Sequence, residues 1–401
     1  MWQMKIGILR EYKSPEDIRV PLTPRHCKKL LEKFNDLEIV VEPYAKRCFK
    51  DEEYEQAGIQ LQNDLSDCDV LLGVKEVPKE RLLNNKIYFF FSHTIKKQDY
   101  NLELMRTLLR KKITMIDHET LVEDNNQRII GFGRWAGIVG AHYAILMIGK
   151  KHGLFNLKPA SQCVSLEEML SQYNGLHLPN AKIALTGKGR VGQGAVEVLQ
   201  AARIKEVSPQ DYLEKEFSET VYTVLDIEDL YKQPNGEPVN RQEFFANPAS
   251  AVNGFTPFTK VTDVLINGMF WDFRAVNLFE RDEISSPNFN IKLISDITCD
   301  VEGSVPITLR QTAIENPYIG INKTTGFETK PFKPETIDVM AVGNLPNELP
   351  KDASTDFGNV IAEKVVPELF NIENSELLKR AMICKNGELT ERFNYLANWV
   401  A

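Results

Sequence analysis

Short apolar runs alternate with longer amphipathic segments over the first third of the chain. The runs predict buried strands at residues 5–9, 37–41, 69–74, 87–91 and 113–116. After the first run, Thr23 can cap a helix that has Pro24 at its first position and extends to Phe34. Strands that alternate with helices favour a parallel, doubly wound α/β sheet.

A second series of strands and helices begins near the middle of the chain. The apolar run 182–186 ends in Gly187-x-Gly189-x-x-Gly192, and a helical pattern follows. Dinucleotide-binding sheets use this strand, tight turn and helix. Gly187 allows the sharp turn, Gly189 lets a pyrophosphate approach the backbone, and Gly192 allows close packing of helix and strand. The phosphates would lie at the N-terminus of the helix.

The other patterns extend both series. Residues 204–208 are predicted as the second strand of the cofactor-binding sheet, and residues 356–401 as a helical stretch that returns to the first sheet. Further helices are predicted at 132–152 and 165–173, and further strands within 263–270, 291–296 and 339–343.

The composition is ordinary for a globular protein and excludes some partners. Of the 401 residues, 43% are hydrophobic and 26% are charged, and the net charge is −8. The length predicts two or three domains. Nucleic acid and anionic membranes bind basic surfaces, so neither is expected as a partner of this acidic chain.

The cysteines, the N-terminus and the apolar stretches indicate the cellular compartment in which the protein is expected. The six cysteines are scattered without the spacing of metal ligands, so no metal site is expected. The N-terminus has no signal-peptide pattern, and the apolar stretch 135–148 is too short for a membrane span and includes His142. These features predict a reduced, cytoplasmic protein.

Ionisable residues follow three predicted strands of the first sheet. Lys75, His93 and Glu119 each lie just beyond the end of an apolar run. Ligands of parallel sheets bind beyond the carboxyl ends of the strands. A lysine in a partly apolar cleft has a lowered pKa, and histidine titrates near neutrality. Lys75 and His93 together therefore suit acid–base chemistry on a carbonyl and an amine, whereas either residue alone could be an ordinary lysine or histidine of a turn.

Six segments carry a family resemblance: Gly73–Pro78, Phe90–Gln98, Gly131–Gly140, Ile266–Trp271, Ser295–Ser304 and Asn344–Pro350. They resemble the lysine-forming saccharopine dehydrogenases and, even more, the lysine–2-oxoglutarate reductase half of the bifunctional aminoadipate semialdehyde synthases. The likeness spans nearly the whole chain. The motifs around Lys75 and His93 are shared with alanine dehydrogenases and transhydrogenases, whereas the run Ser-His-Thr-Ile-Lys at 92–96 favours the saccharopine branch.

The resemblance implies an oxidoreductase with two Rossmann-like, doubly wound parallel-sheet domains separated by an active-site cleft. Residues 1–138 and 345–401 would form the substrate domain, and residues 139–344 an inserted dinucleotide-binding domain. The enzyme would interconvert saccharopine with L-lysine and 2-oxoglutarate, using NAD or NADP and no metal. Its partners would be an amino acid and a 2-oxoacid, with a homo-oligomer as a possible assembly.

Residue roles follow from the same resemblance. Lys75 and His93 match the acid–base pair of the family. Residues that bind or tune the substrate are matched by Arg19, Glu76, Lys96, Glu119 and Arg128; the arginines and Lys96 would clamp substrate carboxylates. The cofactor site is matched by Gly187, Gly189, Arg190, Val191 and Gly192, with Asp296 near the nicotinamide.

The choice between NAD and NADP depends on the strand after the glycine turn. An NAD-binding turn usually has an acid about 20 residues further on, which binds the ribose. Glu206 lies at that spacing from Gly187, but the strand is predicted to end at Ser208, and no arginine follows directly to receive a 2′-phosphate. NAD is favoured over NADP, and neither residue excludes NADP.

Two other interpretations stay open. An alanine-dehydrogenase-like or other opine-forming amino acid dehydrogenase would use the same fold with ammonia or another amine. A nucleotide-binding regulatory protein would retain the fold without turnover, although the presence of both Lys75 and His93 argues against it.

Overall fold

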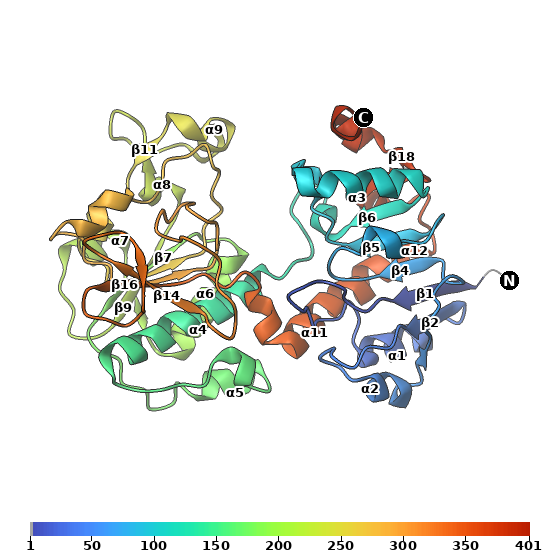
Figure 1. The fold of residues 1–401 in the computed structure, drawn as a ribbon, viewed down its shortest axis with the longest axis horizontal. Coiled ribbons are helices and arrows are strands. Elements are labelled where there is room, and N and C mark those ends of the chain that lie inside the picture. Colours follow the sequence, from blue (N-terminus) through green and yellow to red (C-terminus); the bar gives the residue numbers. More distant parts are fainter. Residues whose placement is uncertain (1–2) are drawn as a thin grey trace. The chain divides into compact units, whose positions relative to one another are not determined.

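The computed structural model describes residues 3–401, which form two compact units. Unit 1 comprises residues 3–132 and Pro350–Ala401, and unit 2 comprises Gly133–Leu349. Unit 1 therefore combines both ends of the chain, seen as the blue-to-cyan and red segments of Figure 1. Among the described residues, no helix combines the length and the apolar character needed to cross a membrane.

Unit 1 is built on an eight-stranded sheet with the order β18-β17-β6-β5-β4-β1-β2-β3. The strands are β1 (Met4–Ile8), β2 (Leu37–Val41), β3 (Gln60–Leu61), β4 (Val70–Leu72), β5 (Ile87–Phe90), β6 (Thr114–Asp117), β17 (Met382–Lys385) and β18 (Glu388–Leu389). All pairs from β3 to β6 are parallel. The central strands contribute apolar side chains to both faces of the sheet, and each face is buried in its own apolar cluster.

The helices of unit 1 surround this sheet. They are α1 (Pro24–Lys33), α2 (Asp51–Gln56), α3 (Asp99–Arg110), α11 (Pro350–Val360), α12 (Val366–Leu369), α13 (Glu376–Ala381) and α14 (Ala397–Val400). The predicted cap of α1 is present, since the Thr23 hydroxyl accepts a hydrogen bond from the His26 N–H.

The prediction that residues 356–401 are helical is wrong for residues 382–389. Strand β17 pairs antiparallel with β6 and extends the sheet, and β18 pairs antiparallel with β17. Asn386 and Gly387 connect the two strands with positive φ angles of 50° and 86°. An Asn-Gly pair favours this two-residue hairpin turn, so the sequence did contain the signal.

Unit 2 contains a second eight-stranded sheet, ordered β15-β14-β16-β13-β12-β7-β9-β8. The strands are β7 (Lys182–Thr186), β8 (Lys205–Glu206), β9 (Val221–Leu225), β12 (Val264–Asn267), β13 (Leu293–Asp296), β14 (Tyr318–Asn322), β15 (Glu328–Thr329) and β16 (Thr336–Met340). The pairs from β8 to β16 are parallel, and β14 is antiparallel to β16 and β15. Two parallel-dominated sheets confirm the predicted Rossmann-like α/β fold class.

The remaining elements of unit 2 are helices and one small hairpin. The helices are α4 (Gly133–His152), α5 (Leu166–Ser171), α6 (Arg190–Ala201), α7 (Pro209–Glu214), α8 (Ile227–Leu230), α9 (Arg241–Ala246) and α10 (Thr256–Thr259). Strands β10 (Tyr231–Lys232) and β11 (Val252–Asn253) form the hairpin.

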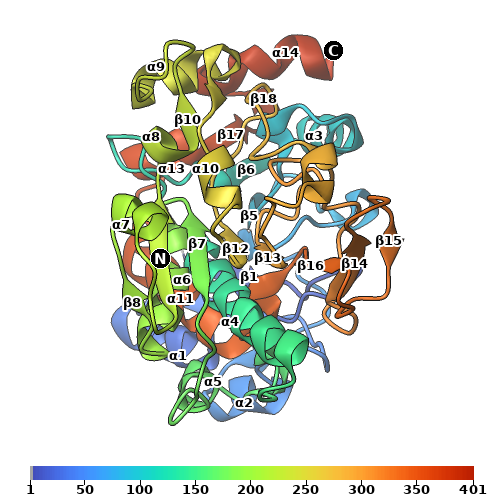
Figure 2. The same ribbon diagram turned by 90° about the vertical axis from the view of Figure 1, so that its left-hand side faces the viewer.

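Helix α4 packs closely along α6 and against β13 (Figure 2). A Cβ atom built on Gly137 would overlap the carbonyl oxygen of Val191, and one on Gly140 would overlap the side chain of Ile297. Glycine is therefore required at these two positions because α4 lies too close to its neighbours to admit a side chain. The reason is not a φ angle that only glycine adopts.

Gly137→Ala is expected to destabilise unit 2 by about 1–3 kcal/mol, because backbone atoms must move to admit the methyl group. The measurement is the thermal unfolding midpoint by scanning calorimetry. Gly133→Ala is the matched control, since its Cβ would lie 3.4 Å from Arg190 and 3.5 Å from Val191, near ordinary contact distance. Equal midpoints for the two variants would contradict this account of the helix packing.

Candidate active site and cofactor-binding turn

The strand ends that carry Lys75 and His93 lie side by side in unit 1. Strands β4 and β5 are parallel neighbours, and the Phe91 N–H donates to the Val74 carbonyl just beyond them (3.0 Å). Both predicted acid–base residues therefore follow the carboxyl ends of neighbouring parallel strands, on the same side of the sheet. His93 adopts a left-handed backbone conformation with φ 55° as the chain turns away from β5.

A buried carboxyl group holds the backbone at Lys75. Glu11, which follows β1, accepts the N–H groups of Val74 (2.6 Å) and Lys75 (2.8 Å). Burial lowers the pKa of Lys75 below its ordinary value, and the positive charge of Arg19 lowers it further. Lys75 can therefore accept and release a proton closer to neutral pH than an exposed lysine can.

Glu119, just after β6, lies among cationic side chains that follow the ends of β5 and β6. Its carboxylate lies 3.3 Å from His93 Nδ1, 3.4 Å from Lys96 Nζ and 3.0 Å from Arg128 Nη2. Burial acts to raise the pKa of Glu119, but the His93 contact and the two cations outweigh it and lower that pKa to about 2. Four of the predicted substrate and catalytic residues thus form one cluster, with Glu119 ionised at its centre.

Glu76 is close enough to influence the charge of both predicted acid–base residues. It forms an ion pair with Lys13, and one of its buried oxygens, Oε2, has no hydrogen-bond partner among residues 3–401. Burial acts to raise the pKa of Glu76, while Lys13 and the nearby His93 lower it overall. Glu76 therefore presents a negative charge close to His93.

Arg19 is buried rather than open to solvent. Its side chain is only 2% exposed, its Nε donates to Asp17 at 2.9 Å, and its guanidinium lies 4.0 Å from the centre of the Phe132 ring. The ion pair and the ring hold Arg19 in a fixed orientation, as a carboxylate-binding arginine requires. Its predicted role as a substrate ligand stays a prediction.

Two positioning carboxyl groups were not predicted from the sequence. One is Glu11, described above, and the other is Asp117 at the end of β6. Asp117 is fully buried and accepts the N–H groups of Ser92 (3.0 Å) and Glu119 (2.7 Å). It therefore fixes the backbone next to His93 and at Glu119. The signal in the sequence was its place at a strand end, directly before His118 and Glu119.

The glycine turn of unit 2 has the shape that a dinucleotide requires. Gly187 has φ +92°, and a Cβ there would press on the backbone of residue 269. Gly189 is the N-terminal cap residue of α6 without any side-chain cap, and a Cβ on it would meet no atom within 4 Å. The structure therefore leaves space beside Gly189 at the start of α6, and its predicted role as a pyrophosphate site stays a prediction. A Cβ on Gly192 would overlap the Gly187 carbonyl oxygen.

Asp296 lies at the end of β13 and is fully buried. Its oxygens accept hydrogen bonds from Asn267 (2.9 Å), Thr298 (2.7 Å) and Thr308 (2.6 Å). Burial raises the pKa of Asp296 above its ordinary value, with these donors opposing the rise. The geometry supports a role in holding the strand ends beside the glycine turn, and its predicted place near the nicotinamide stays a prediction.

The predicted strand at 204–208, the second of the cofactor sheet along the chain, is confirmed in part. The pattern at 204–208 yields only the two-residue strand β8 at the sheet edge, whereas β9 lies next to β7. Glu206 accepts a hydrogen bond from Tyr222, and Ser208 caps α7. The order was missed because the polar segment 208–220 separates the glycine turn from its neighbouring strand.

Asp226 is the acid that follows the strand next to β7. It stands directly after β9, caps α8, and lies 3.1 Å from Arg241 Nη1. In dinucleotide-binding sheets the acid at this position binds the ribose. Asp226 is therefore better placed for that contact than Glu206 or Ser208, and it was missed because its spacing from the turn is about twice the usual one.

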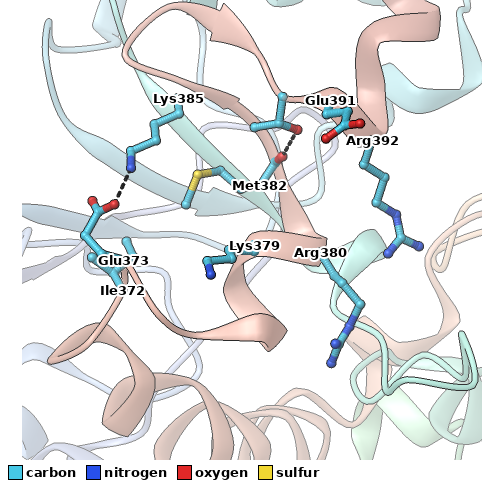
Figure 3. A pocket seen from close by; sticks show the side chains of 9 residues that line it. Ile372, Glu373, Lys379, Arg380, Met382, Lys385, Glu391 and Arg392 are labelled. Carbon is cyan, nitrogen blue, oxygen red and sulfur yellow. Dashed lines mark hydrogen bonds and ion pairs between the residues drawn. The ribbon is translucent and has the colours of Figure 1, made fainter.

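Among residues 3–401 no group of three or more histidine, cysteine or acidic residues could hold a metal ion. Unit 1 also has a surface pocket of about 340 Å³ around β17 and α13 (Figure 3). No predicted site residue lines it, and its cations Lys385 and Arg380 pair with Glu373 and Asp124.

Known proteins with the same fold include an alanine dehydrogenase and a transhydrogenase. Residues 7–139 match the family described as "Alanine dehydrogenase/PNT, N-terminal domain". Among solved structures, an L-alanine dehydrogenase matches 99% of this chain and 100% of its own with a TM-score of 0.67, and a transhydrogenase from Sinorhizobium meliloti matches 96% with a TM-score of 0.57. Identities of 18% and 15% mean that these matches show the fold alone.

Among curated proteins, the relatives that match this chain include aminoadipic semialdehyde synthases and saccharopine dehydrogenases. An Alpha-aminoadipic semialdehyde synthase of Arabidopsis thaliana is 30% identical over 98% of this chain, and its mitochondrial counterpart of Mus musculus is 28% identical. This chain spans only 41% and 47% of these two relatives. A "Saccharopine dehydrogenase [NAD(+), L-lysine-forming]" of Emericella nidulans is 24% identical over 93% of this chain and 94% of its own length.

The chain is thus a homologue of the lysine-forming saccharopine dehydrogenases and the aminoadipic semialdehyde synthases, and its residues 7–139 match an alanine dehydrogenase/PNT N-terminal domain. The family resemblance seen in the sequence is confirmed.

Replacing Glu119 tests the charge cluster through its pH dependence. The folded-state pKa of Glu119 lies below its unfolded value, so the ionised form stabilises the fold fully above about pH 5 and this contribution disappears as the pH falls toward 2. Glu119→Gln is expected to lower the free energy of unfolding on the order of 2 kcal/mol at pH 7 and by roughly half as much or less at pH 3, with the effect vanishing only near pH 2.

The measurement is urea unfolding of both proteins at pH 7, 5 and 3. Glu103→Gln, which removes a carboxylate from an exposed pair with Arg106, is the matched control and is expected to change little. A Glu119→Gln effect that does not decrease with falling pH would contradict the assignment of an ionised Glu119.

Proposed function

We propose that this chain is an NAD-dependent oxidoreductase that interconverts saccharopine with L-lysine and 2-oxoglutarate. The observation that carries the proposal is the pairing of a half-buried lysine of lowered pKa, Lys75, with His93 at the ends of adjacent parallel strands. The saccharopine dehydrogenases among the relatives, which match most of this chain, support the same reaction. The division into a substrate domain of residues 1–138 and 345–401 and a dinucleotide-binding domain of residues 139–344 is part of this proposal.

The substrates explain the charges in unit 1. L-Lysine and 2-oxoglutarate both carry carboxylates, and saccharopine carries three. Arg19 and Arg128 are the guanidinium groups that would bind them, and Lys96 adds a third cation near Glu119. Glu119 balances the cations in the absence of substrate, so that the cluster stays folded around fixed positions.

Proton transfer is the work of Lys75 and His93. The ε-amine of lysine must be neutral to attack the ketone, and the carbinolamine must lose water to give the imine. The lowered pKa of Lys75 suits it to accept the proton of the amine. His93, held by Glu119 at one ring nitrogen, would deliver a proton to the leaving hydroxyl group. The nicotinamide supplies the hydride chemistry when it is bound.

The cofactor turn and Asp226 support NAD. The first N–H groups of α6 would hold the pyrophosphate, and Asp226 would accept hydrogen bonds from the ribose hydroxyl groups. A carboxylate at this position repels the 2′-phosphate of NADP. Arg241 is engaged by Asp226, which reduces its ability to compensate that repulsion.

The decisive assay measures nicotinamide oxidation with a matrix of amino acids and 2-oxoacids. L-Lysine with 2-oxoglutarate and NADH is expected to give turnover. Turnover with ammonium in place of lysine would favour an alanine-type dehydrogenase. Cofactor binding without turnover on any pair would favour a nucleotide-binding regulatory protein and would refute the proposal.

Lys75→Met and His93→Gln are each expected to reduce kcat by about 100-fold or more, because each variant removes one partner in proton transfer. NADH affinity, measured by fluorescence titration, is expected to stay nearly unchanged. The matched control is Lys79→Met, an exposed lysine of the same loop region. Loss of NADH binding in both catalytic variants would show that they act on folding or on the cofactor instead.

Asp226→Asn is expected to raise the KM for NADH about tenfold or more while leaving the KM for NADPH nearly constant, because a charge-assisted hydrogen bond to the ribose is lost. Asparagine can still cap α8, so the fold is retained. Glu206→Gln is the comparison variant. If only Glu206→Gln changed the KM for NADH, the edge strand would hold the ribose and Asp226 would not.

A further inference from the structure

Two peptide bonds lead into Lys75, and each of their polar groups is held by a hydrogen bond. The N–H groups of Val74 and Lys75 donate to the buried carboxyl group of Glu11, and the Val74 carbonyl accepts the Phe91 N–H. The remaining group is the carbonyl of Gly73. Glycine has the widest choice of backbone conformations, so the direction of this peptide depends strongly on what holds its carbonyl.

His118 holds the Gly73 carbonyl. It follows β6, and its Nε2 lies 2.9 Å from the Gly73 oxygen at the end of β4, so its ring reaches past the end of β5, the strand between them. A carbonyl oxygen only accepts hydrogen bonds, so Nε2 carries the proton. Burial lowers the pKa of His118 to about 4, which leaves the ring neutral near pH 7. Its Nδ1 is buried and has no hydrogen-bond partner among residues 3–401.

Phenylalanine rings pack against His118. Phe91 and Phe357 meet it edge to face, with ring centres 5.2 and 5.0 Å away, and the Phe89 ring is tilted at 6.2 Å. Burying an imidazole among these rings is costly, because Nδ1 loses its hydrogen bond to water. An apolar side chain would pack there without that cost. Packing alone therefore does not account for a histidine at this position, whereas the bond to the Gly73 carbonyl does.

The neighbours of His118 in the chain hold the other acid–base residue. Asp117 accepts the N–H of Ser92, which precedes His93, and the Glu119 carboxylate lies 3.3 Å from His93 Nδ1. One run of three residues therefore holds both strand ends. Its outer members act on His93, and its middle member acts on the backbone that leads into Lys75.

We propose that His118 is a positioning residue of the active site, which acts through the Gly73 carbonyl to hold the Lys75 amine at a fixed separation from His93. This inference rests on the proposed function, in which Lys75 and His93 share the proton transfers. A displacement of about 1 Å can cost about 100-fold in rate. Without His118 the Gly73 peptide is held on one side only, and the Lys75 amine is free to move toward solvent.

The test removes the hydrogen-bond donor and keeps the ring. His118→Phe retains an aromatic side chain that cannot donate to Gly73, whereas His118→Gln places an amide N–H near the position of Nε2. With lysine, 2-oxoglutarate and NADH, His118→Phe is expected to lower kcat about tenfold or more and to leave the KM for NADH unchanged. His118→Gln is expected to recover part of this loss.

A second readout follows Lys75 directly and needs no substrate. The rate at which an amine-acylating reagent modifies Lys75 is measured against pH by peptide mass spectrometry, which gives the apparent pKa of that amine. In His118→Phe this pKa is expected to rise toward the ordinary value of a lysine, because the amine leaves its buried position. His118→Gln is expected to retain most of the lowering. The charged groups that act on Lys75 are unchanged in these variants: Arg19, Asp17, Lys13 and Glu76.

His142→Phe is the matched control. His142 is also fully buried, its pKa is also lowered to about 4, and its Nε2 lies 2.8 Å from the carbonyl oxygen of Lys158, but it belongs to unit 2. This variant is expected to reduce the thermal unfolding midpoint and to leave the pKa of Lys75 unchanged.

The proposal is overturned if the pKa of Lys75 is the same in His118→Phe and the unaltered protein, if His142→Phe shifts it equally, or if His118→Gln shifts it as far as His118→Phe. His118→Leu is a second variant without the donor, and failure of both to fold would assign His118 to folding and also overturn the proposal. Because the titration needs no substrate, absence of turnover with lysine and 2-oxoglutarate would refute the proposed function alone.

Discussion

Parallel pairing of strands is the constraint on which both candidate sites depend. Because β4, β5 and β6 run in one direction, their carboxyl ends lie together at one end of the sheet, although Lys75, His93 and Glu119 are far apart in sequence. The same pairing of β7, β9 and β12 brings Gly187, Asp226 and the Asn267–Asp296 network to one edge of the second sheet. Helices on both sides of the strands leave that edge as the place where polar side chains can gather.

The chemistry at the first edge requires charges that are buried but compensated. A carboxylate such as Glu119 would be costly inside a protein if it were alone, and three cationic or protonatable neighbours make it favourable. Glu11 and Asp117 do different work, because they accept backbone N–H groups and so fix the strand ends rather than the substrate. Buried carboxyl groups thus supply both the electrostatics and the rigidity of the cluster.

The comparisons relate the chain to known proteins without assigning its reaction. Alanine dehydrogenase and transhydrogenase structures share the fold at low identity, and the saccharopine dehydrogenases and aminoadipic semialdehyde synthases share the sequence more widely. The chain spans about half the length of the synthases that it matches. The fold alone does not assign the reaction, because one fold can host different chemistries.

The sequence by itself determined much of this protein. Alternating apolar runs predicted the two sheets, the glycine spacing predicted the cofactor turn, and the ionisable residues after the apolar runs identified Lys75, His93 and Glu119, since each signal is local. The order of strands in a sheet is not local. A polar segment between the turn and β9 hid the neighbour of β7, so Asp226 could be found only from the pairing of strands. The hairpin of β17 and β18 was likewise missed within a stretch predicted as helical, because its strands are short and are added to the sheet through the pairing of β17 with β6. Tertiary structure also decided the roles of Glu11 and Asp117, because a carboxyl group becomes a positioning group only when distant backbone N–H groups are brought to it.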